Sequence, residues 1–256
     1  MAMTSTTRRP VARQVSVSVS FVLMVMGSVI GVGALGGTPI SEAAGGLLST
    51  DATYVAPASP AFTLWSVIYA GLGAYTLWQW WDRTDQRRIA GLAIASMLLN
   101  AAWILVIQAG IIELSVLVIV ALLVVLAVMF RRMTPAAGGL QRLVVDGTFG
   151  LYLGWLCVAT CANIAAALAG AGFAGWGMPE VLAIAVLTVA AVVGIALALA
   201  RRGTLAAPLA LAWGLGWIAV ARGTEQPASM PVALAAAALA VLVVATAVVL
   251  AIARHR

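Results

Sequence analysis

The sequence predicts an all-α, polytopic integral membrane protein, a helical bundle of about eight transmembrane helices. The first observation is a series of apolar runs about 20 residues long, the length of helix that crosses a hydrocarbon core about 30 Å thick. The second is the composition, with 64% hydrophobic and 9% charged residues. The runs are continuous in Leu, Val and Ala, whereas the strands of a membrane barrel alternate in polarity. Continuous runs therefore favour helices, which satisfy their own backbone hydrogen bonds in lipid.

The apolar runs also give the order of the spans along the chain. The first run follows a basic start, as in a signal peptide, but it is longer than the apolar part of such a peptide and no good cleavage site follows. We therefore expect it to remain as a helix. GxxxG spacing at Gly27…Gly31 and Gly150…Gly154 predicts close contact between helices. The expected spans are residues 15–36, 62–81, 89–109, 113–130, 143–168, 180–200, 205–222 and 231–253.

The distribution of arginine predicts how the protein is oriented. The chain has 14 residues of the Lys and Arg type, all of them arginine, and all but one lie before the first span, after the last, or in the gaps that follow the second, fourth and sixth. Positive charge marks the cytoplasmic side, so we expect both termini in the cytoplasm, at the plasma (inner) membrane of a bacterium. Because these arginines are spread over loops, their predicted partners are lipid headgroups of the bilayer, and no nucleic acid.

Two charged residues, Arg222 and Asp146, require separate explanations. Arg222 ends the seventh span on the side that carries no other arginine. One interpretation is a snorkelling side chain or a pair with Glu225, and the other is an anion-binding group at the mouth of a cavity. Asp146 lies about one turn inside the fifth span, and Arg142, one turn earlier, is its expected partner.

Groups that support metal binding or covalent catalysis are scarce. The single histidine is His255, and the two cysteines are Cys157 and Cys161, one helical turn apart. A zinc or haem-iron site usually needs His or several Cys ligands, so we expect these cysteines to pack as small apolar side chains. The sequence therefore predicts no enzyme, no metal site and no resident cofactor.

Aromatic and amide side chains recur at helical spacing within four of the expected spans. Residues three or four apart share one face of a helix. Facing one another, such stripes would line a flat apolar pocket with a few polar anchors. The alternative is aromatic packing with interhelical hydrogen bonds from the amides, and the spacing leaves both open. The stripes are Trp65 with Tyr69, Asn100 with Trp103, Trp155 with Ala159 and Asn163, and Trp213 with Trp217.

These stripes resemble the TspO/MBR family, the tryptophan-rich sensory proteins related to the mitochondrial translocator protein. The family has a Pro-rich outer loop that leads into F-x-x-W and W-x-x-L-Y, and here Pro57, Pro60, Phe62 and Trp65-Ser-Val-Ile-Tyr69 follow that order. Leu99-Asn100-Ala-Ala-Trp103 is similar to the family's L-N-x-x-W. Leu151-Tyr152-Leu153-Gly154-Trp155, with Ala159 and Asn163, is similar to P-Y-L-x-W-x-x-x-A-x-x-x-N, although Leu151 replaces the proline.

The resemblance covers residues 15–168 and implies a five-helix core, with a cytoplasmic tail at 1–14 and a three-helix extension at 169–256. It also implies a pocket for a flat hydrophobic ligand, such as a porphyrin or a sterol, beneath the loop 37–61. With no internal histidine, a tetrapyrrole would be held by stacking and hydrogen bonds. Arg222 of the extension is expected to meet a carboxylate of the ligand. The ligand-binding residues that the resemblance implies are Trp65, Tyr69, Asn100, Trp103, Trp155, Ala159 and Asn163. The resemblance does not reach the extension, but Trp217 and Arg222 end on the same side as the loop 37–61 and are added as candidates that could extend the pocket.

The predicted function is therefore binding, sensing or passive transport of a hydrophobic small molecule in the membrane. One alternative is a small-molecule permease, for which Pro208 and Gly214-Leu-Gly216 hint at a discontinuous seventh helix. The other is a structural or regulatory membrane subunit whose aromatic stripes only pack. The extension would then serve as a packing partner or as the face of a homodimer.

Overall fold

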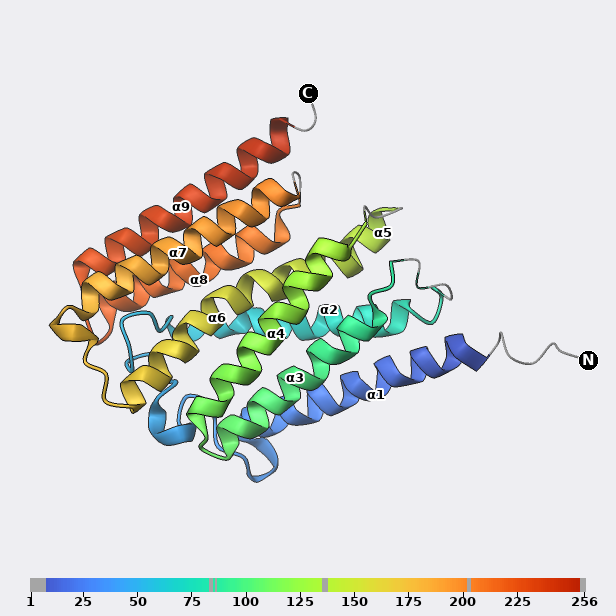
Figure 1. Cartoon of the computed structure of the whole chain (residues 1–256), viewed down its shortest axis with the longest axis horizontal. Helices are drawn as coiled ribbons and strands as arrows, with labels where there is room; N and C mark the ends of the chain where they lie inside the picture. Colours follow the sequence, from blue (N-terminus) through green and yellow to red (C-terminus); the bar gives the residue numbers. More distant parts are fainter. Residues whose placement is uncertain (1–7, 83–84, 86, 135–137, 202–203, 254–256) are drawn as a thin grey trace, which may run out of the picture.

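The chain folds into a bundle of long, antiparallel helices. The computed structural model describes residues 8–82, 85, 87–134, 138–201 and 204–253, so part of the expected tail and His255 lie outside the description. Within these ranges there is no β-strand, which confirms the predicted all-α membrane bundle (Figure 1). The long helices are α1 (Arg8–Gly31), α2 (Leu64–Trp78), α3 (Ala90–Gln108), α4 (Ile112–Arg132), α6 (Thr148–Gly170), α7 (Pro179–Ala200), α8 (Ala206–Thr224) and α9 (Met230–Ala253).

Seven helices of the described chain are long and apolar enough to cross a membrane. The eighth, α2, has 15 residues, whereas a crossing needs about 20. The expected span 62–81 instead begins within the 3₁₀ turn η3 (Ser59–Thr63), where Pro60 occupies a first-turn position that needs no N–H donor.

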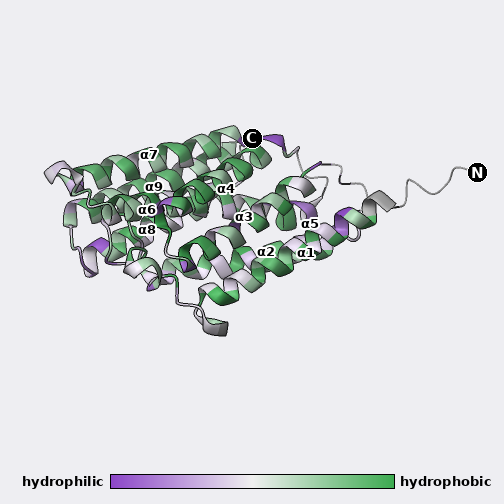
Figure 2. Ribbon diagram, turned by 60° about the horizontal axis from the view of Figure 1, so that its bottom comes forward, coloured by the Kyte–Doolittle hydropathy of each residue, from purple (hydrophilic) through white to green (hydrophobic). Residues whose placement is uncertain are grey.

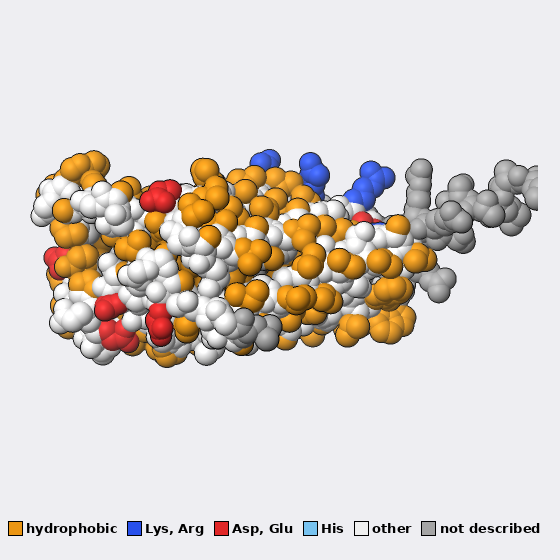
Figure 3. All heavy atoms as spheres, turned by 90° about the horizontal axis from the view of Figure 1, so that it is seen from below, with side chains coloured by type: hydrophobic (Ala, Val, Ile, Leu, Met, Phe, Trp, Pro, Cys, Tyr) orange, Lys and Arg blue, Asp and Glu red, His pale blue; other side chains and the backbone are white. Residues whose placement is uncertain are grey.

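The two ends of the bundle differ in charge. Here the arginine-rich end is the one at which α1 begins and α2, α4, α7 and α9 end; it carries Arg13, Arg87, Arg131, Arg132 and Arg201. The lid end is the opposite one, and the loop 37–61 is called the lid. Figure 3 shows acidic side chains gathered toward one end of a largely hydrophobic face and arginines toward the other. Which end faces the cytoplasm stays a prediction.

Apolar residues cover the helices on most sides, as Figure 2 shows by hydropathy. Many large hydrophobic side chains on the outside of the bundle are exposed, among them Leu117, Val189 and Val241. In water such a surface would be unstable, whereas lipid solvates it. The exposed apolar surface is therefore the side that faces the bilayer.

Helix α6 is the central helix, and it packs closely against α8 of the extension. A Cβ added to Gly154 would lie 2.0 Å from the carbonyl oxygen of Ala207, and one added to Gly150 would lie 2.8 Å from Cβ of Ala206. The predicted close contact at Gly150…Gly154 is thus present, and its partner is α8. The five-helix core and the extension share one packed interface.

Asp146 pairs with partners that helix spacing did not predict. It lies in η4 (Arg142–Gly147), a π-helical turn that leads into α6. Arg87 Nη2 is 2.8 Å from its carboxylate and Arg201 Nη1 is 3.8 Å away. The expectation of an Arg142 partner is wrong, because the loop before α3 and the end of α7 bring two other guanidinium groups to the carboxylate.

Candidate functional site

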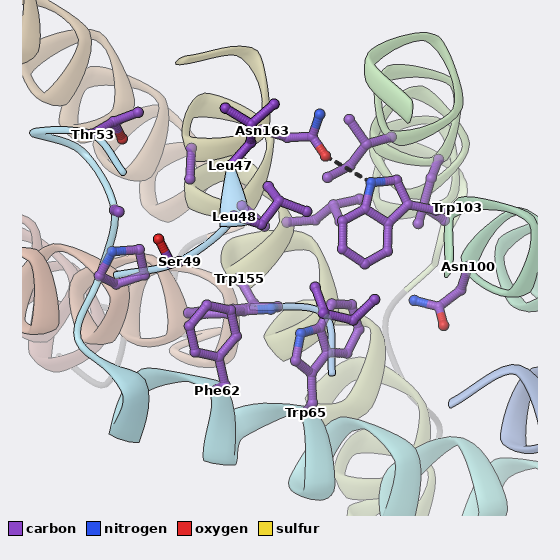
Figure 4. Close-up of a pocket in the computed structure, with 18 residues that line it drawn as sticks. Leu47, Leu48, Ser49, Thr53, Phe62, Trp65, Asn100, Trp103, Trp155 and Asn163 are labelled. Atoms are coloured by element: carbon purple, nitrogen blue, oxygen red, sulfur yellow. Dashed lines mark hydrogen bonds between the residues drawn. The ribbon is translucent and has the colours of Figure 1, made fainter. Parts of the chain in front are cut away.

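A cavity lies at the lid end, between α2, α3, α4 and α6, with the lid as its roof (Figure 4). Its volume is about 60 Å³. The helices contribute Phe62, Trp65, Asn100, Trp103, Ile119, Leu122, Trp155, Leu156, Ala159, Ala162 and Asn163. The lid contributes Ile40, Leu47, Leu48, Ser49, Thr53, Ala56 and Pro57.

Aromatic rings from η3, α2 and α6 form one wall of the cavity. The Trp65 and Trp155 rings meet edge to face, with centroids 6.3 Å apart and planes at 85°. Phe62 meets Trp155 in the same way, at 5.7 Å and 82°. Tyr69 stacks on the other side of Trp65 at 5.4 Å. Edge-to-face packing fixes each ring by its neighbours, so the wall is held in place without a ligand.

Asn163 holds the polar side of the cavity together. Its Oδ1 accepts a hydrogen bond from Trp103 Nε1 at 2.8 Å (Figure 4), and its Nδ2 donates to Ser115 Oγ at 2.8 Å. The side chain is 1% exposed. An amide in an apolar interior must be hydrogen-bonded, and these bonds join α3, α4 and α6 at the depth of the cavity.

Asn100 is the second amide of the cavity. Its Oδ1 accepts a hydrogen bond from the Tyr69 hydroxyl at 3.1 Å, which links α3 to α2. Figure 4 shows its amide nitrogen turned toward the space between Trp65 and Trp103. Asn100 therefore presents a polar group to a mostly apolar cavity.

Within the part of the chain that the structure describes, two polar groups of lining residues have no hydrogen-bond partner. These are the Nε1–H of Trp155 and the Oγ1 of Thr53, both buried. An unsatisfied buried donor costs about 1–3 kcal/mol relative to a paired one. A ligand atom that accepts a hydrogen bond would remove that cost.

The lid carries an ordered turn next to the cavity. The Ser49 hydroxyl donates to the Asp51 carboxylate. This hydrogen bond, together with one from the backbone of Asp51, lowers the pKa of Asp51 below its ordinary value of 3.8. Hydrogen bonds to the charged form favour it, so Asp51 remains ionised at neutral pH.

The structure brings most of the predicted site residues together. Trp65, Asn100, Trp103, Trp155, Ala159 and Asn163 line the cavity, and Tyr69 lies behind Asn100 as its hydrogen-bond partner.

Two residues from the extension do not line the cavity. Trp217 is absent from its walls, and its carbonyl accepts a hydrogen bond from the lid. Arg222 is 0% exposed and donates to the carbonyl oxygens of Thr50, at 2.7 Å, and Pro227, at 3.0 Å. Neither the expectation that Arg222 meets the ligand nor a pair with Glu225 fits this geometry, because Nη1 and Nη2 of the guanidinium donate to backbone carbonyls.

Sequence reasoning missed Phe62 as a lining residue, and it missed the contribution of α4. Phe62 lies three residues before Trp65, so helical spacing was an available signal. Ser115, Ile119 and Leu122 of α4 had no such signal, because serine and aliphatic residues are ordinary in a membrane span. Among the described residues, no group of three His, Cys, Asp or Glu side chains is placed to share a metal ion.

A comparison with known proteins supports the family that the sequence motifs indicate. The family model of TSPO-like proteins matches residues 14–249. The chain belongs to this family. No curated protein and no solved structure matches the chain. The family match runs through α7, α8 and most of α9, so it extends beyond residue 168, where the motifs end. The chain is an integral membrane protein.

Proposed function

We propose that this TSPO-like protein binds a flat hydrophobic small molecule, such as a porphyrin or a sterol, in the cavity beneath the lid. It acts as a receptor or passive carrier and carries out no covalent chemistry. The observation that carries the proposal is one cavity in which the aromatic stripes of α2, α3 and α6 meet beneath a loop that closes over them. Apolar walls with a few placed polar groups are what small-molecule sites have in common.

The angle between the aromatic rings restricts how a flat ligand fits. Because the Trp65 and Trp155 planes are nearly perpendicular, a planar molecule can stack on one ring and must meet the other at its edge. The unpaired Trp155 Nε1–H then favours a ligand with a hydrogen-bond acceptor at its rim. A carboxylate, a carbonyl or a hydroxyl oxygen meets this requirement.

The size of the cavity implies that binding requires movement. A space of about 60 Å³ holds roughly four to six water-sized groups, far less than a tetrapyrrole. The helices of the site are packed against one another, whereas the lid is a loop held to the bundle by hydrogen bonds and side-chain packing. We therefore propose that the lid lifts to admit the ligand and closes again over it once side chains of the lining have moved aside.

A permease is less well supported by the same helices. That alternative needs a discontinuous seventh span, but α8 runs unbroken from Ala206 to Thr224. Pro208 lies in its first turn, where the N–H groups have no partner within the helix. Neither Gly214 nor Gly216 interrupts the helix.

Tryptophan fluorescence of the purified protein, titrated with protoporphyrin IX, tests the proposal. We expect saturable quenching. Trp65→Ala should weaken binding about 10- to 100-fold, because it removes a large stacking surface, and Asn100→Ala about 2- to 10-fold, because it removes a hydrogen bond. Trp176→Phe is the matched control, since Trp176 is 77% exposed and lies outside the cavity. Quenching that does not saturate, or that is the same in both cavity variants and the control, would contradict the proposed site.

A further inference from the structure

Helix α8 is hydrogen-bonded to the lid at three places. Arg222 Nη2 donates to the Thr50 carbonyl at 2.7 Å. The Trp217 carbonyl accepts from the Ala58 N–H at 3.2 Å. Trp213 Nε1 donates to the Ala61 carbonyl at 3.0 Å. Each bond joins the extension to the roof of the cavity, across more than 150 residues of sequence.

The bond from Arg222 differs from an ion pair. Its side chain is 0% exposed, and no carboxylate of the described residues lies within salt-bridge distance of it. Its second hydrogen bond, to the Pro227 carbonyl at 3.0 Å, is to the turn between α8 and α9. The lid can therefore release the hydrogen bond at Thr50 while Arg222 stays bonded to the turn between α8 and α9. A water molecule can then take the place of the Thr50 carbonyl, which carries no charge.

Each of the three lid residues that make these hydrogen bonds is close in sequence to residues that line the cavity. Thr50 lies between Ser49 and Thr53, Ala58 follows Pro57, and Ala61 precedes Phe62. The hydrogen bonds are thus distributed along the roof, and releasing them frees the part of the lid that covers the ligand space.

We infer that α8 is the latch of the lid, and that Trp213 and Arg222 are positioning residues that set how fast a ligand enters and leaves the cavity. This inference rests on the proposed function. Ligands of tetrapyrrole size pass only when the lid lifts, so one opening step precedes both entrance and release. Weakening the latch should therefore raise both rates together and leave the dissociation constant nearly unchanged, as long as the closed lid remains the main state.

The first measurement detects lid opening without a ligand. Ala56 lines the cavity and is 7% exposed, so an Ala56→Cys variant, with Cys157→Ala and Cys161→Ala, is labelled by a thiol reagent only when the lid lifts. Trp213→Phe keeps an aromatic side chain but removes the indole N–H and its hydrogen bond, so labelling should be about 2- to 10-fold faster. Arg222→Gln should accelerate it further, and Trp176→Phe should leave it unchanged.

The second measurement follows protoporphyrin IX binding and release by stopped flow, using porphyrin emission. In Trp213→Phe we expect both rate constants to rise by the factor seen in labelling, with a dissociation constant within about twofold of the wild type. Arg222→Lys, which keeps the charge but has one nitrogen in place of the two that donate, should lie between wild type and Arg222→Gln. If Arg222→Gln does not fold, Trp213→Phe still decides the outcome.

The results separate this inference from the proposed function. Wild-type protein that binds no porphyrin would contradict the proposed function, and the labelling rates would still test the latch. Unchanged labelling in Trp213→Phe and Arg222→Gln would overturn the latch. Faster labelling with unchanged porphyrin rates would overturn the control of access, because the ligand would then use another route.

Discussion

The lid end and the arginine-rich end connect the extension to the core in opposite ways. At the lid end, α8 donates hydrogen bonds to backbone groups of the lid and accepts one from it, and the cavity lies beneath the lid. At the arginine-rich end, Arg87 and Arg201 surround Asp146, and Arg201 also lies over the Phe130 ring at 5.0 Å. Hydrogen bonds to backbone can exchange with water one at a time, whereas buried charges that lose their partners are left unpaired at high cost.

The difference indicates which end moves. The charged cluster joins the loop before α3, the turn before α6 and the end of α7, and Arg87 also donates to the Thr134 carbonyl at the end of α4. Four elements are thereby held together away from the cavity. We interpret this cluster as the fixed end of the bundle, opposite a lid that opens.

The largest expected effect is on stability, and it comes from removing one charge of the cluster at the arginine-rich end. Asp146→Asn removes the charge that neutralises Arg87, whose side chain is 4% exposed, and should lower the free energy of unfolding in detergent by about 3–5 kcal/mol. Glu113→Gln, at an exposed carboxylate, should change it by less than about 0.5 kcal/mol.

A double variant sharpens this test. Arg87→Met with Asp146→Leu replaces both charges by apolar groups. It should recover most of the lost free energy of unfolding, because removing both partners of a buried ion pair costs less than leaving one charge unpaired. If Asp146→Asn has the same free energy of unfolding as the wild type, the charged cluster does not stabilise the arginine-rich end.

A smaller effect is expected where α6 touches the first turn of α8. In Gly154→Ala the new Cβ would lie 2.0 Å from the Ala207 carbonyl oxygen, so α8 must shift, at about 1–3 kcal/mol of unfolding free energy. Gly216→Ala is the matched control, because nothing lies within 4 Å of a Cβ at that position. It should be neutral or slightly stabilising. Equal losses of unfolding free energy in the two variants would show that the close contact of Gly154 with Ala207 is not the cause.

The smallest effect is expected for pH at the lid. The pKa of Asp51 is lowered by the Ser49 hydrogen bond, so any stability that its ionised form contributes is present above the ordinary value of 3.8 and is lost only as pH falls below that value. Between pH 7 and pH 5, labelling of the Ala56→Cys variant, corrected for the reagent's own pH dependence, should not change because of Asp51. A rise that Asp51→Asn abolishes would contradict this assignment.

Much of the site was predictable, because helical spacing determines which side chains share a face. Trp155, Ala159 and Asn163 recur every four residues, so they had to form one stripe, and the stripe does line the cavity. The same reasoning failed for Asp146, where Arg142 was in register but the partners came from distant elements. It also failed for Arg222, because no spacing indicates that a backbone carbonyl of the lid will meet it.

The sequence by itself determined the helices, their alternation across a membrane and the faces that carry aromatic rings, since each follows from local composition and period. Only the tertiary structure decided that Trp217 and Arg222 hold the lid and do not line the cavity, and that Arg87 neutralises Asp146. The physical reason is that hydrogen bonds and ion pairs depend on distances of about 3 Å between atoms, and between residues far apart in the chain these distances are set by how the helices pack.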